Sequence, residues 1–292
     1  MADPRIALLL AMADDELITG HRLSEWTGWV PYIEEDLALS SIAQDEIAHG
    51  RAMYELAVAL GAGTDADALA FGRAPRDYRC AVVCERPNGD FAYTLARHWL
   101  YENADDVRTA ALLDSSYKEL VEALRVFRLE ERYHLDHART WFTRLAEGPV
   151  EARTRIATAL SQVLPEALSL FEPLAGEEVL LADGVMPRSN DSLLAEWLAR
   201  VAADLEAAGL EHVLENAGDV HVGELVPTSS GAAEVTESQP LRVPGIERRD
   251  GVWVHTGGFA GAGGRLGTRS DDFAALYEDM TGLYRGHPGA TW

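Results

Sequence analysis

Two Glu-x-x-His pairs are the residues of this sequence whose types and spacing could do chemistry. Glu46 and His49 lie in the segment IAQDEIAHG, and Glu131 and His134 lie in EERYHLDHARTW. Residues three apart share one face of an α-helix, so each carboxylate stands beside an imidazole. Carboxylate oxygens and imidazole nitrogens are donors that transition metals accept in proteins. Each pair is therefore a candidate half of a metal site.

Both pairs fall within rows of apolar residues at helical spacing. A lone carboxylate on such a face is costly to bury unless something pairs with it. Either each of these two faces buries an unpaired carboxylate at a cost in stability, or it holds a ligand. The first row is Leu39, Ile42, Glu46, His49, Met53, Leu56 and Leu60, and the second is Leu120, Leu124, Phe127, Glu131, His134, Ala138, Trp141 and Leu145.

Two further apolar stripes each carry one inward carboxylate, Glu16 on the first and Glu102 on the second. Glu16 and Glu46 are 46 − 16 = 30 residues apart, and Glu102 and Glu131 are 131 − 102 = 29 apart. In up-and-down helix pairs, these near-equal offsets place the two pairs of glutamates at a similar level along the axis of the bundle. One Glu from each of two helices, with a Glu-x-x-His from each of two others, is the ligand pattern of di-iron and di-manganese carboxylate bundles.

We therefore predict a site for two iron ions. The carboxylates would bridge and neutralise two hard cations, while one imidazole per metal leaves positions open for oxygen. Occupancy is a separate question, because the same residues could form a vestigial site without metal. No residue is assigned a catalytic role. The predicted metal ligands are Glu16, Glu46, His49, Glu102, Glu131 and His134.

Neighbouring ionisable residues have less specific interpretations. Asp105 or Asp106, one turn after Glu102, could replace it as a ligand. His98 is interpreted as a residue that supports a ligand from outside or is satisfied within the core. We expect the remaining candidates to be solvated, capping or polar-face residues, namely His21, His137, Asp15, Asp45 and Glu130.

Long helices, which the sequence patterns predict, must position these residues. They are expected near 4–27, 31–61, 91–114, 117–147, 150–172, 190–210 and 270–285, with a long connection at 62–88. Asp90 or Asn88 is a candidate N-cap for the third pattern, and Gly61 is a candidate stop for the second. Two short-loop helix pairs joined by one long connection predict an all-α fold. It is a ferritin-like four-helix bundle with one long crossover and extra C-terminal helices.

The composition changes after residue 217, where Gly, Pro, Ser and Thr become frequent and the helical period is lost. A short hairpin near Val252–Val254 is the one regular element expected there. We divide the chain into a helical bundle domain at 1–216 and a second part at 217–292. The second part is an irregular arm and a C-terminal helix, packed on the bundle or on a partner. Such a segment suits a surface that wraps another chain and becomes ordered on binding.

Overall composition excludes several classes of protein. The 292 residues are 47% hydrophobic, enough for one large domain or two small ones, but the formal net charge is −23. This charge argues against nucleic acid and membrane surfaces as partners, and it suggests no basic pocket for phosphate groups. No run approaches the roughly 20 apolar residues of a membrane span, and the N-terminus lacks a signal-peptide pattern, so a cytoplasmic location is expected. Cys80 and Cys84 are expected to be reduced and buried.

Four segments resemble the PaaA/PaaC family, and in particular the structural subunit of bacterial phenylacetyl-CoA epoxygenase. They are GHRLSEWTG at 20–28, IAQDEIAHGRAMY at 42–54, ERPNGDFAYTLAR at 85–97 and the terminal HPGATW. The resemblance extends over almost the full length. The catalytic branch of the family shares the bundle and the Gln-Asp-Glu-x-x-His element, here at 44–49, but its other motifs are not recognised.

The resemblance implies a component of a multicomponent ring-1,2-epoxidising monooxygenase in aerobic phenylacetate degradation. That complex uses oxygen, and electrons from a reductase, to epoxidise the ring of phenylacetyl-CoA. The implied partners are a catalytic PaaA-like subunit and, through the complex, the reductase of the same system. A homo-oligomer is left open. In the family the di-iron chemistry belongs to the catalytic partner and some structural subunits have lost ligands, whereas all six predicted ligands are present here.

Three functions follow from these observations. The first is a structural, stabilising subunit that is not catalytic alone and whose own site is metal-bound or vestigial. The second is a di-iron carboxylate oxygenase that is active in its own right. The third is an iron-storage bundle, which is disfavoured because a closed cage has no use for the Gly-rich arm.

Overall fold

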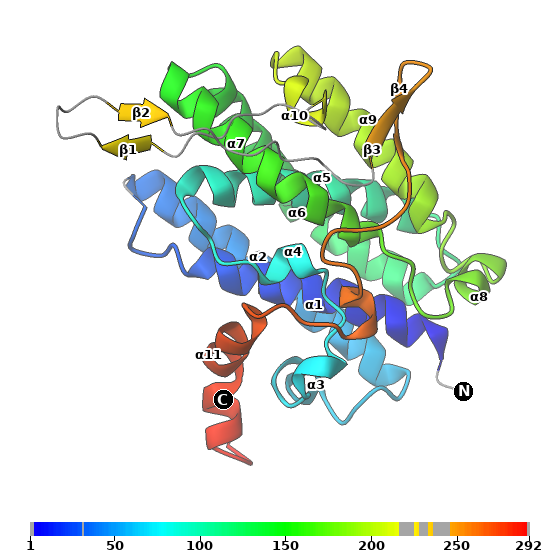
Figure 1. Cartoon of the computed structure of the whole chain (residues 1–292). Helices are drawn as coiled ribbons and strands as arrows, with labels where there is room; N and C mark the ends of the chain where they lie inside the picture. The colour runs from blue at the N-terminus through cyan, green and yellow to red at the C-terminus, as the bar shows by residue number, and fades with distance from the viewer. Residues whose placement is uncertain (1–2, 31, 216–224, 228–232, 236–245, 291–292) are drawn as a thin grey trace.

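Four long helices form the centre of the structure, a computed structural model that describes residues 3–30, 32–215, 225–227, 233–235 and 246–290 (Figure 1). They are paired in chain order, and the second also contacts the fourth. The helices are α1 (Pro4–Ser24), α2 (Ile33–Ala59), α5 (Phe91–Leu112) and α6 (Lys118–Ala146). Between the pairs, the long crossover contains α3 (Ala66–Phe71), the 3₁₀ turn η1 (Pro75–Asp77) and α4 (Val82–Glu85). The predicted all-α, ferritin-like fold is confirmed.

Local sequence signals set the ends of these helices. The Asp90 side chain accepts a hydrogen bond from the backbone N–H of Tyr93 at 2.8 Å and so caps α5. Gly61 follows α2 with φ of +89°, a left-handed conformation that favours glycine and ends the helix. The start of this helix was expected at Pro31, which lies outside the described residues, and α2 begins at Ile33.

A second layer of helices covers the α5–α6 pair. The α7 helix contacts both α5 and α6, and the α9 helix contacts α5. The indole N–H of Trp197, fully buried on α9, donates to the carbonyl of Leu100 at 3.1 Å and fixes this contact. The elements of this layer are α7 (Val150–Ala167), the 3₁₀ turn η2 (Leu168–Phe171), α8 (Glu177–Ala182), α9 (Asn190–Ala207) and α10 (His212–Glu215).

Two short antiparallel hairpins lie in the arm. The first pairs β1 (Leu225–Pro227) with β2 (Ala233–Val235) and was not anticipated. The second pairs β3 (Ile246–Arg249) with β4 (Val252–His255), which confirms the hairpin expected near Val252. Its two turn residues, Asp250 and Gly251, both have positive φ, as two-residue hairpin turns favour. The β4 strand contacts α9, and the last helix, α11 (Phe273–Gly286), contacts α3 and η1.

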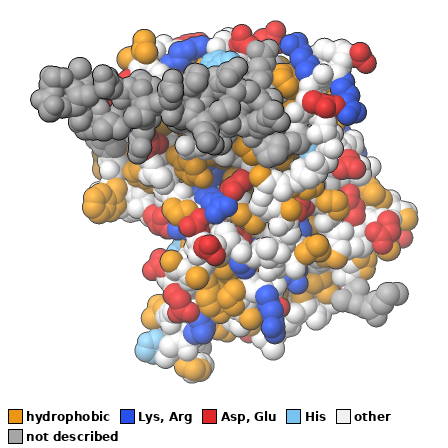
Figure 2. All heavy atoms as spheres, in the orientation of Figure 1, with side chains coloured by type: hydrophobic (Ala, Val, Ile, Leu, Met, Phe, Trp, Pro, Cys, Tyr) orange, Lys and Arg blue, Asp and Glu red, His pale blue; other side chains and the backbone are white. Residues whose placement is uncertain are grey.

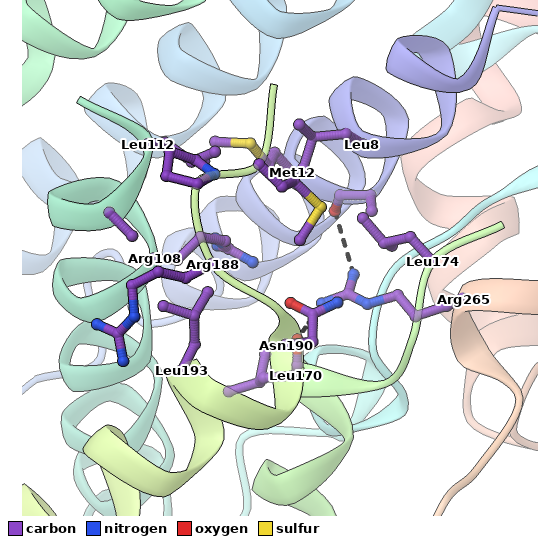
Figure 3. Close-up of a pocket in the computed structure, with 14 residues that line it drawn as sticks. Leu8, Met12, Arg108, Leu112, Leu170, Leu174, Arg188, Asn190, Leu193 and Arg265 are labelled. Atoms are coloured by element: carbon purple, nitrogen blue, oxygen red, sulfur yellow. Dashed lines mark hydrogen bonds between the residues drawn. The ribbon is translucent and has the colours of Figure 1, made fainter. Parts of the chain in front are cut away.

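Arg265, in the 3₁₀ turn η3 (Gly264–Leu266), anchors the end of the arm inside the bundle. Its side chain is 3% exposed and makes a two-pronged ion pair with Asp15 of α1 at 2.8 and 2.7 Å. It also donates to the carbonyls of Ala11 and Leu170, and Figure 3 shows it reaching between these two segments. The pocket drawn there is about 20 Å³, room for about one water molecule rather than a ligand. Asp15 is therefore buried, and its expected place on a polar face was wrong.

Side chains of all kinds are mixed over the face seen in Figure 2, without a field of one charge sign. Within the described part of the chain, no helix has both the length and the apolar character to cross a membrane. Cys80 and Cys84 are free thiols and buried, as expected.

Candidate metal centre

The six predicted ligands converge in the centre of the four-helix bundle. They form two groups that share Glu46, and within each group one donor atom per residue lies within 4.8 Å of the others. Glu16 comes from α1 and Glu102 from α5, while α2 and α6 each supply a Glu-x-x-His pair. The first group is Glu16, Glu46, His49 and Glu131, and the second is Glu46, Glu102 and His134.

Two glycines bring α1 and α2 close enough to place the first group. A Cβ atom at Gly20 would lie 2.9 Å from the Cβ of Glu46 and 2.8 Å from the carbonyl oxygen of Ala43. A Cβ at Gly50 would lie 3.3 Å from the Cβ of Glu16 and 3.0 Å from a carbonyl oxygen of α1. Each glycine thus faces the ligand carboxylate of the opposite helix. A larger residue at either position would push the ligands apart.

Glu131 lies between the two imidazoles. Its Oε1 is 2.8 Å from Nδ1 of His49, and its Oε2 is 3.7 Å from Nδ1 of His134. The Nδ1 atom of His134 is also 3.4 Å from Oε1 of Glu46. Both histidines therefore direct Nδ1 inward, toward carboxylates that face two groups at once. Glu46 belongs to both groups, while Glu131 belongs to the first and has its second oxygen directed toward His134 of the other.

The outward nitrogen of each histidine meets a carboxylate from the opposite helix. Nε2 of His49 on α2 is 2.8 Å from Oε2 of Glu130 on α6. Nε2 of His134 on α6 is 3.3 Å from Oδ2 of Asp45 on α2. Such outer carboxylates fix the orientation and tautomer of a metal-binding imidazole. The sequence interpretation missed this role. The available signal was that an acidic residue precedes the glutamate in both Glu-x-x-His pairs.

The inward donor atoms lack hydrogen-bond partners. Buried polar groups in proteins are normally satisfied, so a concentration of unsatisfied atoms needs an explanation. The cluster holds six such atoms: Glu16 Oε2, Glu46 Oε1, Glu46 Oε2, His49 Nδ1, Glu102 Oε1 and His134 Nδ1. These are lone pairs that face a common space, and two cations would satisfy them. The donor set therefore fits a di-metal centre.

Without cations the cluster holds its charge balance through protons. Burial, reinforced by the charge of Glu102, raises the pKa of Glu46 to about 8. Burial also raises the pKa values of Glu16 and Glu102 well above the usual range. Two divalent cations would carry four positive charges and match the four carboxylates. Metal and protons are thus alternative ways to neutralise one buried site.

The pKa shifts of the two histidines and Glu131 favour the charged forms of these groups: the pKa values of His49 and His134 are raised, and that of Glu131 is lowered. Burial disfavours a charged imidazole, but the carboxylates of Glu131 and Glu16 outweigh it and raise the pKa of His49 to about 9. Burial alone would raise the pKa of Glu131, but the neighbouring imidazoles of His134 and His49 hold it at about 2. Glu131 is therefore the carboxylate that is ionised when the site contains only protons.

Apolar side chains line the first group. A cavity of about 10 Å³ lies among Glu16, His49 and Glu131, with space for about one water molecule or ion. The ring of Phe127 stacks on His49 with the ring centroids 4.1 Å apart. The hydroxyl of Tyr101 donates to Oε1 of Glu16 at 3.0 Å. The remaining apolar lining consists of Met12, Met53 and Leu124.

The alternative ligands are engaged elsewhere. Asp105 accepts hydrogen bonds from Arg108 at 2.7 Å and from Thr109 at 3.1 Å. Asp106 pairs with Arg200 at 2.6 Å. Of the three acids in this stretch of α5, Glu102 is therefore the one that joins the cluster.

A chain of contacts runs from the cluster toward the outer end of α6. Nδ1 of His98 lies 3.2 Å from Oε1 of Glu102, and its Nε2 lies 3.4 Å from Nδ1 of His137. Nε2 of His137 is 3.0 Å from Glu35, which also accepts from the indole N–H of Trp141 at 2.6 Å. His98 thus supports a predicted ligand, as interpreted. The side chain of His137 is only 8% exposed and contacts His98 and Glu35, so its expected solvated or capping role was wrong.

A groove of about 740 Å³ opens between α5, α6 and α9 and reaches the cluster at Glu102 and Glu131. Its lining holds five acidic residues and five arginines, so the groove is of mixed charge. The expectation that this acidic chain has no basic pocket for phosphate groups stays a prediction. The arginines that line the groove are Arg125, Arg128, Arg132, Arg139 and Arg200.

Comparisons with known proteins agree with the resemblance in the sequence. The family described as "Phenylacetic acid catabolic protein" (PaaA_PaaC) matches residues 1–223. The chain is also 31% identical over 213 residues to a protein of Escherichia coli strain K12 that is described as a subunit of 1,2-phenylacetyl-CoA epoxidase. That alignment covers 72% of this chain and 85% of the relative. The family match includes all six cluster residues and ends before the hairpin β3–β4 and α11. The chain therefore belongs to the PaaA/PaaC family of phenylacetic acid catabolic proteins.

Proposed function

We propose that this chain is a structural and stabilising subunit of a phenylacetyl-CoA epoxidase complex and that it has kept a di-metal site of its own. Family membership supports the first part, since the E. coli relative is described as a subunit of such an enzyme. The observation that carries the second part is the convergence of six unsatisfied donor atoms from four helices on one buried site.

The roles of the ligands follow from their positions. Glu16 and His49 would hold one metal ion and Glu102 and His134 the other, with Glu46 between them. Glu131 would join Glu16 and His49, and its second oxygen faces the imidazole of His134. A pair of iron ions supplies one-electron and dioxygen chemistry when bound.

The chain's own residues orient and isolate that site. Asp45 and Glu130 hold the imidazoles through their outer nitrogens, which keeps Nδ1 directed inward. Phe127 covers His49 and limits the entry of water on that side. In the proposed subunit, this arrangement stabilises the bundle when metal neutralises the buried carboxylates.

Metal analysis tests the retained site. The chain is purified anaerobically, supplied with ferrous iron and desalted. We expect about two iron ions per chain, as two shared-ligand groups require. The double variant Glu46→Gln, Glu131→Gln should lose most of this iron because two of the four carboxylate ligands are gone. A stoichiometry near zero in the unmodified chain would make the site vestigial, with protonated carboxyl groups in place of metal.

The partner surface proposed for the catalytic subunit is an apolar patch at the start of α2. Trp29 and Leu37 have 80% and 64% of their side chains exposed, and Tyr32 and Ile33 lie between them. Leu37→Asp should abolish co-purification with a PaaA-like subunit. Leu283→Asp is the matched control, because Leu283 is also exposed, at 60%, but belongs to α11 rather than to the start of α2. Equal retention of the partner by both variants would contradict the proposed surface.

One observation favours the alternative, an oxygenase active in its own right. The groove at Glu102 and Glu131 gives an outside molecule a route to the cluster. Oxygen consumption in the presence of phenylacetyl-CoA and the reductase decides between the two functions. We expect none from the isolated chain. Consumption that depends on the substrate and is lost in Glu46→Gln would establish the catalytic function instead.

A further inference from the structure

Four side chains with metal-binding atoms lie one behind another between the start of α2 and the cluster. They are Glu35 on α2, His137 on α6, and His98 and Glu102 on α5, and together we call them the donor path. Nε2 of His137 is 3.0 Å from Oε1 of Glu35, and its Nδ1 is 3.4 Å from Nε2 of His98. Nδ1 of His98 is 3.2 Å from Oε1 of Glu102. Each member thus meets the next through a carboxylate oxygen or an imidazole nitrogen.

Two of these three contacts are poor hydrogen bonds. Within the described part of the chain, Nδ1 of His98 and Oε1 of Glu102 are buried without a hydrogen-bond partner, although they lie close together. The 3.4 Å between the two imidazoles exceeds the usual hydrogen-bond range of about 2.7–3.2 Å. Buried polar groups are normally satisfied, so hydrogen bonding alone does not account for the inner half of the donor path.

The same separations suit adjacent ligands of one metal ion. Ligand atoms about 2.1 Å from an ion lie about 3.0 Å apart in octahedral geometry and about 3.4 Å apart in tetrahedral geometry. The three distances along the donor path run from 3.0 to 3.4 Å and fall within these limits. An ion therefore fits between any two consecutive members without a large movement of either.

Exposure to solvent decreases along the donor path toward the cluster. The side chains of His137 and Glu35 keep 8% and 7% of their surface exposed, whereas those of His98 and Glu102 keep 1% each. Burial lowers the pKa of His98 well below its usual range, so its ring is uncharged and keeps a lone pair for a metal ion. The donor path thus leads from a partly solvated pair to a dry one.

The outer end of the donor path lies in an acidic turn. Glu34, Glu35 and Asp36 occupy the first turn of α2, and Glu34 is exposed. Carboxylates gathered in this way raise the local concentration of cations. The indole N–H of Trp141 donates to Oε2 of Glu35 at 2.6 Å and holds this carboxylate beside His137.

We propose that the donor path carries divalent transition-metal ions from the start of α2 into the cluster, with the pair His137 and His98 as a transit site. The proposal rests on the proposed function, because it requires a di-metal site at the inner end. It adds the way by which that site is filled. The groove between α5, α6 and α9 is the competing entrance, and its lining includes neither His137 nor Glu35.

The rate of metal uptake tests the donor path separately from the site. Metal-free full chain is mixed with cobalt(II) chloride under anaerobic conditions, and the visible absorption of bound cobalt is followed over time. His137→Gln should slow uptake by about tenfold, because one step loses its imidazole and its barrier rises, while the final cobalt content stays unchanged. Glu35→Gln should also slow uptake, since the amide still accepts from Trp141 but no longer attracts a cation.

His21→Gln is the matched control. His21 also faces a carboxylate, that of Asp279 at 3.2 Å, but it is not a member of the donor path, so its uptake rate should equal that of the unmodified chain. Full final loading at an unchanged rate in both path variants would overturn the donor path and leave the di-metal site intact, as entry through the groove requires.

A lower final cobalt content at an unchanged rate would also overturn the donor path, because His137 and Glu35 would then support the site without carrying ions. The absence of bound cobalt in the unmodified chain would contradict the retained site, and the donor path with it. The final content and the rate thus distinguish a failure of the proposed function from a failure of this inference.

Discussion

Asp45 and Glu130 each contact the histidine of the neighbouring helix. Each lies one residue before a predicted ligand on its own helix, yet each meets the histidine of the other helix. The arrangement is reciprocal, so α2 orients the imidazole of α6 and α6 orients that of α2. A metal site of this kind depends on the register of two helices as well as on the identity of its ligands.

Replacement of either outer carboxylate tests its role. In Asp45→Asn and Glu130→Gln the imidazole keeps its neighbour but loses the charge that orients it. Metal affinity should fall by about 10- to 100-fold in each variant, measured by competition with a chelator. Asp36→Asn is a control, since Asp36 on α2 accepts a hydrogen bond from the backbone N–H of Gly28 and lies outside the cluster. An unchanged affinity in both test variants would refute this role.

The protonation of the cluster predicts how metal-free protein responds to pH. Glu46 has its pKa raised to about 8 and His49 to about 9, so the folded state binds more protons than the unfolded state across this window. Stability therefore decreases as pH rises, from about pH 5 for Glu46 and from about pH 6.5 for His49. The midpoint of thermal unfolding should fall between pH 5 and pH 9 in metal-free protein.

Bound metal should remove or reverse that trend. Metal ligands must be deprotonated, so metal affinity, and the stability that it confers, increases with pH. Calorimetric scans of metal-free and iron-loaded protein over the same pH range make the comparison. Parallel curves for the two forms would show that the cluster does not exchange protons for metal.

At the scale of elements, the close contact of α1 with α2 depends on two glycines. Gly20 and Gly50 each face the ligand carboxylate of the other helix, at distances too short for an added methyl group without movement. The glycines therefore determine the spacing of Glu16 and Glu46. Both lie on the apolar stripes of their helices. From the sequence alone each is recognised as a small residue, but the close contact with the opposite helix is not.

Gly50→Ala tests the spacing. Its Cβ would lie 3.0 Å from the carbonyl oxygen of Ala13 and 3.2 Å from the N atom of Leu17, and backbone atoms cannot give way as side chains do. The variant should lose about 1–3 kcal/mol of unfolding free energy and part of its metal affinity. Gly282→Ala on α11 is the control, because its Cβ meets nothing within 4 Å, and it should gain about 0.5–1 kcal/mol. Urea unfolding measures both.

The helices and the six cluster residues could be predicted because each depends on a short-range pattern. Apolar spacing of three and four reveals an inward face, and a carboxylate within it is conspicuous. The roles of Asp45, Glu130 and His137 could not be predicted in this way. All three lie away from the apolar rows, and only the neighbouring helix decides whether they face solvent or a partner.

The arm was harder to interpret because its anchor is distant in sequence. Arg265 lies 250 residues from Asp15, in a Gly-rich segment without any period. Nothing local indicates that this arginine is buried. The expectation that the arm serves a partner stays a prediction for the residues outside the described part, whereas η3 and α11 contact the chain's own helices.

At the scale of the whole molecule, Arg265 connects the last quarter of the chain to the first helix. It supplies much of the charge that balances Asp15, which is fully buried and also contacts Arg108 at 3.2 Å. Burial opposes the charge of Asp15, but Arg265 and Arg108 outweigh it and lower its pKa. Removal of the arm therefore affects the bundle as well as any partner.

Arg265→Ala should destabilise the bundle by about 3–5 kcal/mol, because it leaves a buried carboxylate poorly compensated. The double variant Arg265→Ala, Asp15→Asn should recover part of that loss. Arg249→Ala is the control, since Arg249 is exposed in the same arm and pairs only with neighbouring Glu247. Guanidinium unfolding gives the three free energies. A loss equal to that of the control would show that Arg108 alone suffices for Asp15.

The pairing of Asp15 with Arg265 also has a consequence during synthesis. The ribosome releases the first helix long before the residue that neutralises it, because 250 residues separate the two. Nascent chains that already contain all four bundle helices have Arg108 beside the buried carboxylate of Asp15 but still lack Arg265. A prematurely terminated product that lacks Arg265 thus remains easier to unfold and more accessible to proteases than the finished chain.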